Sequence, residues 1–213
     1  MKVLTKNRSQ SKIPYSDVYD LQVFLEKEGY GDFKPSGFYG PLTQSALAKF
    51  QKEHFITPSV GNLASQTRRK INLMTNTKTE ILAAISESLL NIDISPTDRS
   101  VDNTACVESF ICLYEEAFGE RLSNTLSTIE LDKIFKANPK KFKPTSTPKR
   151  GTIIISPTES NTRVGHVGSF IDASRIISNS SSDGKQKQNF TYQSWLARYK
   201  DKLKLQVYMY DLI

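Results

Sequence analysis

The sequence contains few of the side chains that most often bind metal ions. Its 213 residues include only two histidines, His54 and His166, and two cysteines, Cys106 and Cys112. A catalytic zinc site usually takes three protein ligands, and neither the HExxH nor the CxxC spacing occurs. We therefore expect neither a metal nor a cofactor. One cysteine–histidine pair, by contrast, is enough for a thiol nucleophile with its base.

Long hydrophobic runs are also missing. No stretch approaches the ~20 consecutive apolar residues that span a bilayer, so we expect no membrane span. The first ten residues carry positive charge without an apolar segment behind them, which predicts that a secretory signal is absent. The composition, with 38% hydrophobic and 24% charged residues, is that of an ordinary globular chain.

The net charge is +7, from 29 basic and 22 acidic residues. Such a charge attracts polyanions, which include nucleic acid, anionic membranes and acidic cell-wall polymers. No basic helix, RNP pattern or zinc finger is present, so we expect no nucleic-acid partner. The basic residues concentrate in the segments 138–144 and 148–150, which we interpret as a solvated loop.

The N-terminal part has the pattern of three short helices. The first begins at Ser16 or Asp17 and ends at Gly29, with apolar residues at spacings of three and four. A turn rich in glycine and proline precedes a second helix, which we expect Thr43 to cap, and a third helix is predicted over 65–73. The predicted apolar positions of the first two helices are Val18, Leu21, Phe24, Leu25, Leu42, Ala46, Leu47 and Phe50.

An ordered series of short motifs runs through these helices: L-Q-x-x-L from Leu21, Gly29-Tyr30, G-x-x-G-x-x-T from Gly37, and Phe50-Gln51. On this series, residues 15–74 resemble the type 1 peptidoglycan-binding domain. The resemblance implies non-catalytic attachment to the bacterial cell wall, with peptidoglycan as the partner. Residues 64–67 repeat the G-x-x-T theme too weakly to indicate a repeat protein.

The polar segment 76–80 is the predicted linker between two domains, 1–75 and 81–213. In the second domain we expect a helix over 81–90, a polar loop over 91–103 and a helix from Ala105 to Phe118. Strands are predicted over the segments 151–156, 164–172, 175–179 and 203–210, the second and third joined as a hairpin by 172–174. Helices followed by antiparallel strands indicate an α+β domain, so the predicted fold class is an all-α three-helix bundle followed by α+β.

Cys106 falls in the first turn of the predicted helix 105–118, after the capping candidates Asp102, Asn103 and Thr104. Free backbone N–H groups and the helix dipole stabilise a thiolate there, and with a basic partner they lower a cysteine pKa below ~8.5. Cys112 lies ~9 Å further along the helix axis, which excludes a disulfide between the two. We interpret Cys112 as a small buried hydrophobe.

His166 follows about sixty residues later, at the start of a predicted strand. Packed against the helix, its imidazole would deprotonate the thiol and later protonate the leaving amine, while a third polar group fixes the tautomer. We interpret the other histidine, His54, as a helix-end surface residue.

Three features of this second part, Cys106 at the helix start, the strand 151–155 and Gly165-His-Val-Gly168, resemble the papain-like cell-wall hydrolases of the NlpC and CHAP types. The resemblance covers about residues 80–213 and implies a papain-like fold with catalytic Cys106 and His166. It places a third residue on the strand after the histidine, where Asn179 is the first choice and Ser178 and Asp172 follow. Two positions depart from the pattern: Ala105 precedes the cysteine instead of a polar residue, and Thr152 stands where an aspartate is common.

The leading hypothesis is therefore a monomeric peptidoglycan hydrolase, either an endopeptidase or an N-acetylmuramoyl-L-alanine amidase. The resemblance suggests a phage endolysin, cytoplasmic until its release to the wall, or a virion-associated lysin. The alternative is a non-catalytic wall-binding or virion structural protein. An L,D-transpeptidase is disfavoured because its Ser-His-Gly-Cys string is absent. Lytic glycosidases use carboxylates, but Glu108, Glu115 and Glu116 belong to an ordinary helix face.

Overall fold

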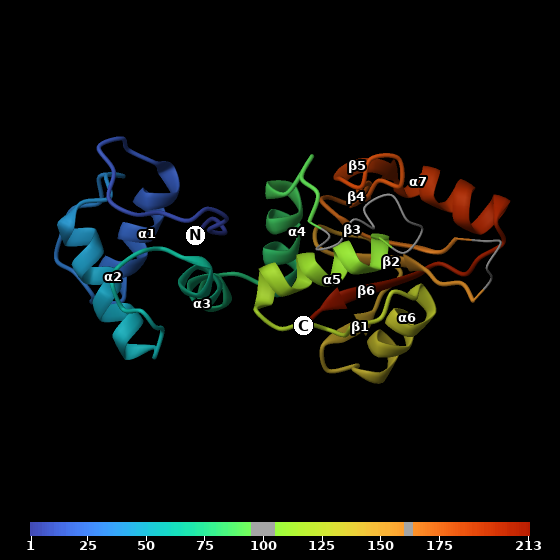
Figure 1. Cartoon of the computed structure of the whole chain (residues 1–213), viewed down its shortest axis with the longest axis horizontal. Coiled ribbons are helices and arrows are strands. Elements are labelled where there is room, and N and C mark those ends of the chain that lie inside the picture. Colours follow the sequence, from blue (N-terminus) through green and yellow to red (C-terminus); the bar gives the residue numbers. More distant parts are fainter. Residues whose placement is uncertain (95–104, 160–163) are drawn as a thin grey trace. The chain divides into compact units, whose positions relative to one another are not determined.

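The computed structural model describes residues 1–94, 105–159 and 164–213. The chain divides into two compact units, Met1–Asn76 (unit 1) and Thr77–Ile213 (unit 2). Figure 1 shows helices alone in unit 1 and helices around a sheet in unit 2. The capping candidates Asp102, Asn103 and Thr104 lie outside the described residues.

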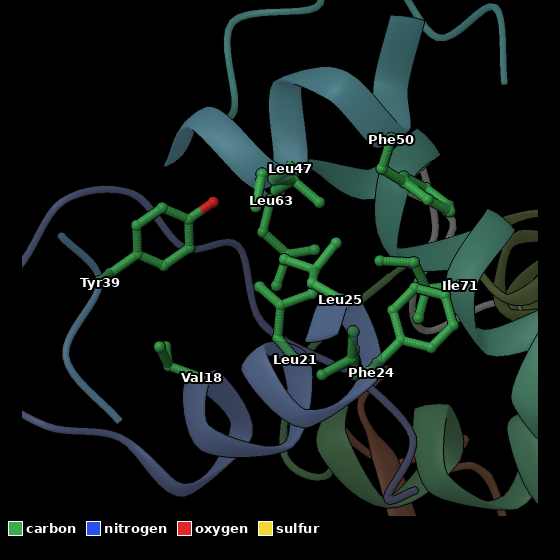
Figure 2. Packing of buried hydrophobic residues seen from close by; sticks show 11 residues of the cluster. Val18, Leu21, Phe24, Leu25, Tyr39, Leu47, Phe50, Leu63 and Ile71 are labelled. Carbon is green, nitrogen blue, oxygen red and sulfur yellow. The ribbon is translucent and has the colours of Figure 1, made fainter. Parts of the chain in front are cut away.

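Unit 1 contains three helices, α1 (Ser16–Lys27), α2 (Pro41–Glu53) and α3 (Ser65–Thr75), as the hydrophobic spacing predicts. Their apolar residues converge on one core, in which α1 and α2 face each other (Figure 2). Leu42 is an exception to the predicted core positions, because it is 69% exposed on the outer side of α2. The fully or almost fully buried core consists of Leu4, Val18, Leu21, Phe24, Leu25, Tyr39, Ala46, Leu47, Phe50, Leu63 and Ile71.

Thr43 does not cap α2, contrary to the prediction. The helix begins two residues earlier, at Pro41, and Thr43 is buried. Its hydroxyl accepts a hydrogen bond from the amide nitrogen of Gln22 at 2.8 Å, while Gln22 Oε1 accepts one from the backbone N–H of Gly37 at 2.8 Å. Gly37 has φ +81°, a left-handed conformation that favours glycine. The buried side-chain amide of Gln22 thus holds the turn before α2, because it is hydrogen-bonded to both Gly37 and Thr43.

The same arrangement recurs at the turn before α3. Gln51 Oε1 accepts from the backbone N–H of Gly61 at 2.8 Å, and its Nε2 donates to Thr67 Oγ1 at 2.9 Å. Gly61 also has a positive φ, +74°. Each of the two turns is therefore organised by a glutamine from the preceding helix, a left-handed glycine and a threonine. The sequence shows this internal repeat only weakly, because the spacing from glutamine to threonine differs between its two copies.

Unit 2 is a six-stranded antiparallel sheet with helices on both faces, which agrees with the predicted α+β order. The strands lie in the order β1-β6-β2-β3-β4-β5. The elements in chain order are α4 (Lys78–Ser88), α5 (Ala105–Phe118), α6 (Thr128–Ala137), β1 (Phe142–Pro144), β2 (Ile153–Ser156), β3 (His166–Phe170), β4 (Arg175–Asn179), β5 (Gln186–Thr191), α7 (Tyr192–Trp195), the π-helix η1 (Leu196–Lys202) and β6 (Tyr208–Leu212).

The two faces of the sheet have different coverings. Helix α5 packs on β3 and β4, and α4 packs on β3 and β6 (Figure 1). A hydrogen bond of 2.9 Å joins Ser86 Oγ of α4 to Ser169 Oγ of β3. The other face packs against α7 and η1 through Trp195 and Tyr199, which form a cluster with Phe170 and Ile176. Successive strand residues point to opposite faces of the sheet. Whether a residue of β3 or β4 has an even or an odd number therefore decides which helices its side chain faces.

Several boundaries in unit 2 differ from the predictions. α4 begins at Lys78, inside the predicted linker 76–80, because Thr77 caps it by accepting from the backbone N–H of Glu80. The basic segment 138–144 is not entirely a loop, since its last three residues form β1 with Phe142 buried. The final strand begins at Tyr208, later than predicted. Strand β5 was not predicted because its sequence is largely polar; helix α6 was not predicted either, although Leu131 and Phe135 are buried apolar residues at helical spacing.

Candidate active site

Cys106 lies in the first turn of α5, as predicted, and is 6% exposed. Its sulfur donates a hydrogen bond to the carbonyl oxygen of Gly165 at 3.9 Å. Burial raises the pKa of the thiol to about 11, although the backbone N–H groups of Val167, Val107 and Cys106 act in the opposite direction. The expected lowering of the thiol pKa is therefore wrong, because desolvation outweighs the helix-start N–H groups. At neutral pH the resting group is a thiol.

His166 begins β3 and its ring is enclosed by aromatic side chains. The ring stacks on Tyr199, with centroids 5.7 Å apart and an interplanar angle of 15°, and lies 5.4 Å from the ring of Trp195. Burial, together with the positive charge of Arg198, lowers the pKa of His166 to about 3. The imidazole is therefore neutral at physiological pH, as a general base must be before it accepts a proton.

A chain of two hydrogen bonds sets the tautomer of this imidazole. His166 Nε2 lies 2.9 Å from Ser178 Oγ, and Ser178 Oγ donates to Asn189 Oδ1 at 2.7 Å. A hydroxyl has one proton, so a serine that donates to Asn189 accepts from the ring. His166 consequently carries its proton on Nε2. Its Nδ1 keeps a free lone pair, which is the position of a base that accepts a proton.

Asn179, the first choice for the third residue, forms no hydrogen bond with the imidazole in the described structure. β3 pairs with β4 so that Gly168 lies opposite Ser178. His166 and Ser178 therefore share the face that meets α7 and η1, whereas Asn179 is on the α5 side. Ser178, the second choice, is the residue that hydrogen-bonds the ring, while a catalytic role for Asn179 stays a prediction. Asp172, the third choice, caps the hairpin turn by accepting from the backbone N–H of Arg175 at 2.7 Å.

One pocket of about 250 Å³ brings the candidate residues together, since Cys106, His166 and Asn179 all line it. Asn179 Oδ1 is buried and has no hydrogen-bond partner in the described structure. No hydrogen bond joins the sulfur to the imidazole among the described residues; both groups border the same cavity. The remaining lining residues are Val164, Ser180, Ser181, Asn189, Phe190, Arg198 and Tyr199.

The other cysteine and histidine do not line this pocket. Cys112 is half-buried, with the guanidinium of Arg121 3.9 Å from its sulfur, so the prediction of a small buried hydrophobe is wrong. Both cysteines are free, which agrees with the predicted absence of a disulfide between them. His54 ends α2 in unit 1, where its ring packs on Phe50 with centroids 4.4 Å apart.

Among the described residues, carboxylates do not gather at this pocket. Glu115 pairs with the guanidinium of Arg121 at 2.9 Å, and none of the lining residues is acidic. Across residues 1–94, 105–159 and 164–213, no three histidine, cysteine or carboxylate side chains are placed to hold a metal ion. The lining of the described pocket thus includes one thiol and one imidazole, without a pair of carboxylates.

A comparison with protein families identifies the part of unit 1 that contains the three helices and their turns. Residues 14–71 match the family model of a putative peptidoglycan binding domain. The prediction for residues 15–74 is thereby confirmed, and peptidoglycan as a partner is supported. This peptidoglycan-binding domain lies within unit 1, so the match does not bear on the pocket of unit 2. A search of curated proteins found no match to the chain. Among the described helices, none has the length and apolar character to cross a membrane.

Proposed function

We propose that the protein is a peptidoglycan hydrolase, in which unit 1 attaches to the wall and unit 2 cleaves an amide bond through Cys106. The observation that carries the proposal is the placement of Cys106 and His166 on one pocket, in a chain that also has a peptidoglycan-binding domain. Attachment raises the local concentration of wall substrate around the second unit. The papain-like fold and the NlpC or CHAP relationship belong to this proposal.

The reaction begins from a neutral thiol and a neutral imidazole. The sulfur attacks the carbonyl carbon of the substrate amide while His166 Nδ1 takes the thiol proton, and a C–S bond forms. As the tetrahedral intermediate collapses, the C–N bond breaks and the imidazolium gives its proton to the leaving amine. Water, deprotonated by the imidazole, then hydrolyses the thioester and the thiol is restored. Throughout the cycle, Ser178 accepts from Nε2–H and keeps Nδ1 directed to the reaction.

Endopeptidase and N-acetylmuramoyl-L-alanine amidase activities remain alternative forms of this proposal, since both cleave an amide. A phage endolysin or a virion-associated lysin is the corresponding biological setting. One observation favours the non-catalytic wall-binding alternative: the sulfur donates to the Gly165 carbonyl and not to the imidazole. The hydrolase proposal therefore requires the thiol to turn toward Nδ1 when substrate enters the pocket.

Turbidity of purified cell walls tests the proposal. We expect the wild type to clear the suspension, Cys106→Ser to lose at least ~100-fold in rate because its hydroxyl is a poorer nucleophile, and Cys112→Ser to act like the wild type. Equal clearing by wild type and Cys106→Ser would exclude the thiol mechanism. Binding of all three proteins to the walls without clearing by any would favour the non-catalytic alternative.

A further inference from the structure

The pocket of unit 2 is lined by a positively charged residue that forms no ion pair with any described carboxylate. Arg198, on η1, lines it together with Cys106 and His166, and none of the lining residues is acidic. Within the described chain Arg198 forms no ion pair; its guanidinium lies 5.6 Å from the ring centre of Tyr199. Arg198 is an exposed residue that borders the cavity, so a ligand in the pocket can reach it.

Arg198 differs in this respect from the other described arginines of unit 2. Arg121 pairs with Glu115, Arg175 pairs with Asp172, and Arg150 pairs with two glutamates. Each of those guanidinium groups is neutralised within the fold. Arg198 instead directs its charge at the pocket, where its field reaches the imidazole of His166.

We propose that Arg198 binds a free carboxylate of the substrate peptide near the scissile amide, so that the enzyme selects stem peptides with free carboxylates over amidated ones. The inference rests on the proposed function and names the substrate class for the same site. A guanidinium donates two parallel, charge-assisted hydrogen bonds to a carboxylate, whereas a carboxamide offers one neutral acceptor oxygen. The other polar lining groups, including Ser180, Ser181 and Asn189, are neutral and do not repel an anion.

The test uses two muramyl tetrapeptides that differ only in whether their side-chain and α-carboxylates are free or amidated. We expect wild-type kcat/KM to be about 10- to 100-fold higher for the free form, mainly through a lower KM, because the lost interaction is a charge-assisted one. Arg198→Gln should reduce this preference to about threefold or less. Lys200→Gln, an exposed change on the same π-helix outside the pocket lining, should keep the wild-type preference.

Binding measured in the Cys106→Ala background separates this inference from the hydrolase proposal. Calorimetric titration should show tighter binding of the free-carboxylate peptide, a preference that Arg198→Gln removes and that weakens as salt is raised. Selective binding without cleavage by the wild type would retain the carboxylate site and reject the hydrolase. Equal cleavage of both peptides by the wild type, or an unchanged preference in Arg198→Gln, would overturn the carboxylate site.

Discussion

The neutral state of His166 makes a specific prediction about stability and pH. In the folded protein, burial and the charge of Arg198 hold the pKa of His166 at about 3. In the unfolded chain a histidine has a pKa of ~6.5. The free energy of unfolding is therefore unaffected by the low pKa of His166 above pH ~6.5 and decreases as the pH falls toward 3. The reason is that the histidine binds a proton in the unfolded chain but not in the folded protein.

The size of the effect follows from the difference in bound protons. At pH 5.0 the medium is ~1.5 units below the pKa of the unfolded histidine, and each unit is worth ~1.36 kcal/mol. Unit 2 should thus lose about 2 kcal/mol between pH 7.5 and pH 5.0. Over this range most carboxylates remain ionised, so histidine dominates the change. With a urea m-value of ~1–3 kcal/mol/M, the unfolding midpoint should fall by roughly 1 M.

Trp195 provides the assay. It is the single tryptophan of the chain, and its ring centroid lies 5.4 Å from that of His166, so its fluorescence reports unfolding around this side chain. Urea titrations from pH 7.5 to 5.0 should show the loss in the wild type and in His54→Gln, whose changed residue belongs to unit 1. His166→Gln should show little pH dependence over this range. A flat wild-type profile, or an equal loss in His166→Gln, would refute the buried neutral imidazole.

Three further predictions concern individual side chains. Ser178→Ala should lower kcat by about fivefold, since ~1 kcal/mol of hydrogen bonding orients the ring, whereas Asn179→Ala should cost less. The reverse order in a peptide-cleavage assay would contradict the assignment of Ser178. In a Cys112→Ser background, iodoacetamide should label native Cys106 increasingly between pH 9 and 11, because burial raises the pKa of the Cys106 thiol to about 11. Complete, fast labelling at pH 8 would contradict a buried thiol. Gln22→Leu should destabilise unit 1 by about 1–3 kcal/mol, because the backbone N–H of Gly37 and the hydroxyl of Thr43 lose their hydrogen-bond partner. Urea unfolding followed by far-UV circular dichroism measures this loss, and an unchanged unfolding midpoint would contradict the role of Gln22.

Helices with strong apolar periodicity were predictable from the sequence. The spacing of Phe110, Ile111 and Tyr114 predicts the helix 105–118, and the structure has α5 over the same residues. β5 was missed because most of its side chains are polar. α6 was missed although its sequence carries the signal, since Leu131 and Phe135 are apolar at helical spacing. The capping role of Thr43 was wrong because its hydroxyl is used by Gln22, a tertiary contact that no local pattern reveals.

The candidate site was predictable in part. Cys106 and His166 border the same pocket, although their pKa values depend on burial, which the sequence does not specify. Which of Ser178 and Asn179 meets the imidazole could have been inferred from the predicted hairpin. The predicted hairpin with loop 172–174 places residues 171 and 175 opposite each other, so even-numbered residues of both strands share one face. His166 and Ser178 meet that condition, and Asn179 does not.

The most direct test of the hydrolase account is a chemical assay of the groups that appear when purified walls are treated with the wild type and with Cys106→Ala. We expect the wild type to release new free amino groups, which mass spectrometry assigns to one amide bond, without new reducing sugar ends. Cys106→Ala should release neither. New reducing ends, or equal release of amino groups by the two proteins, would contradict cleavage of an amide by the Cys106 thiol.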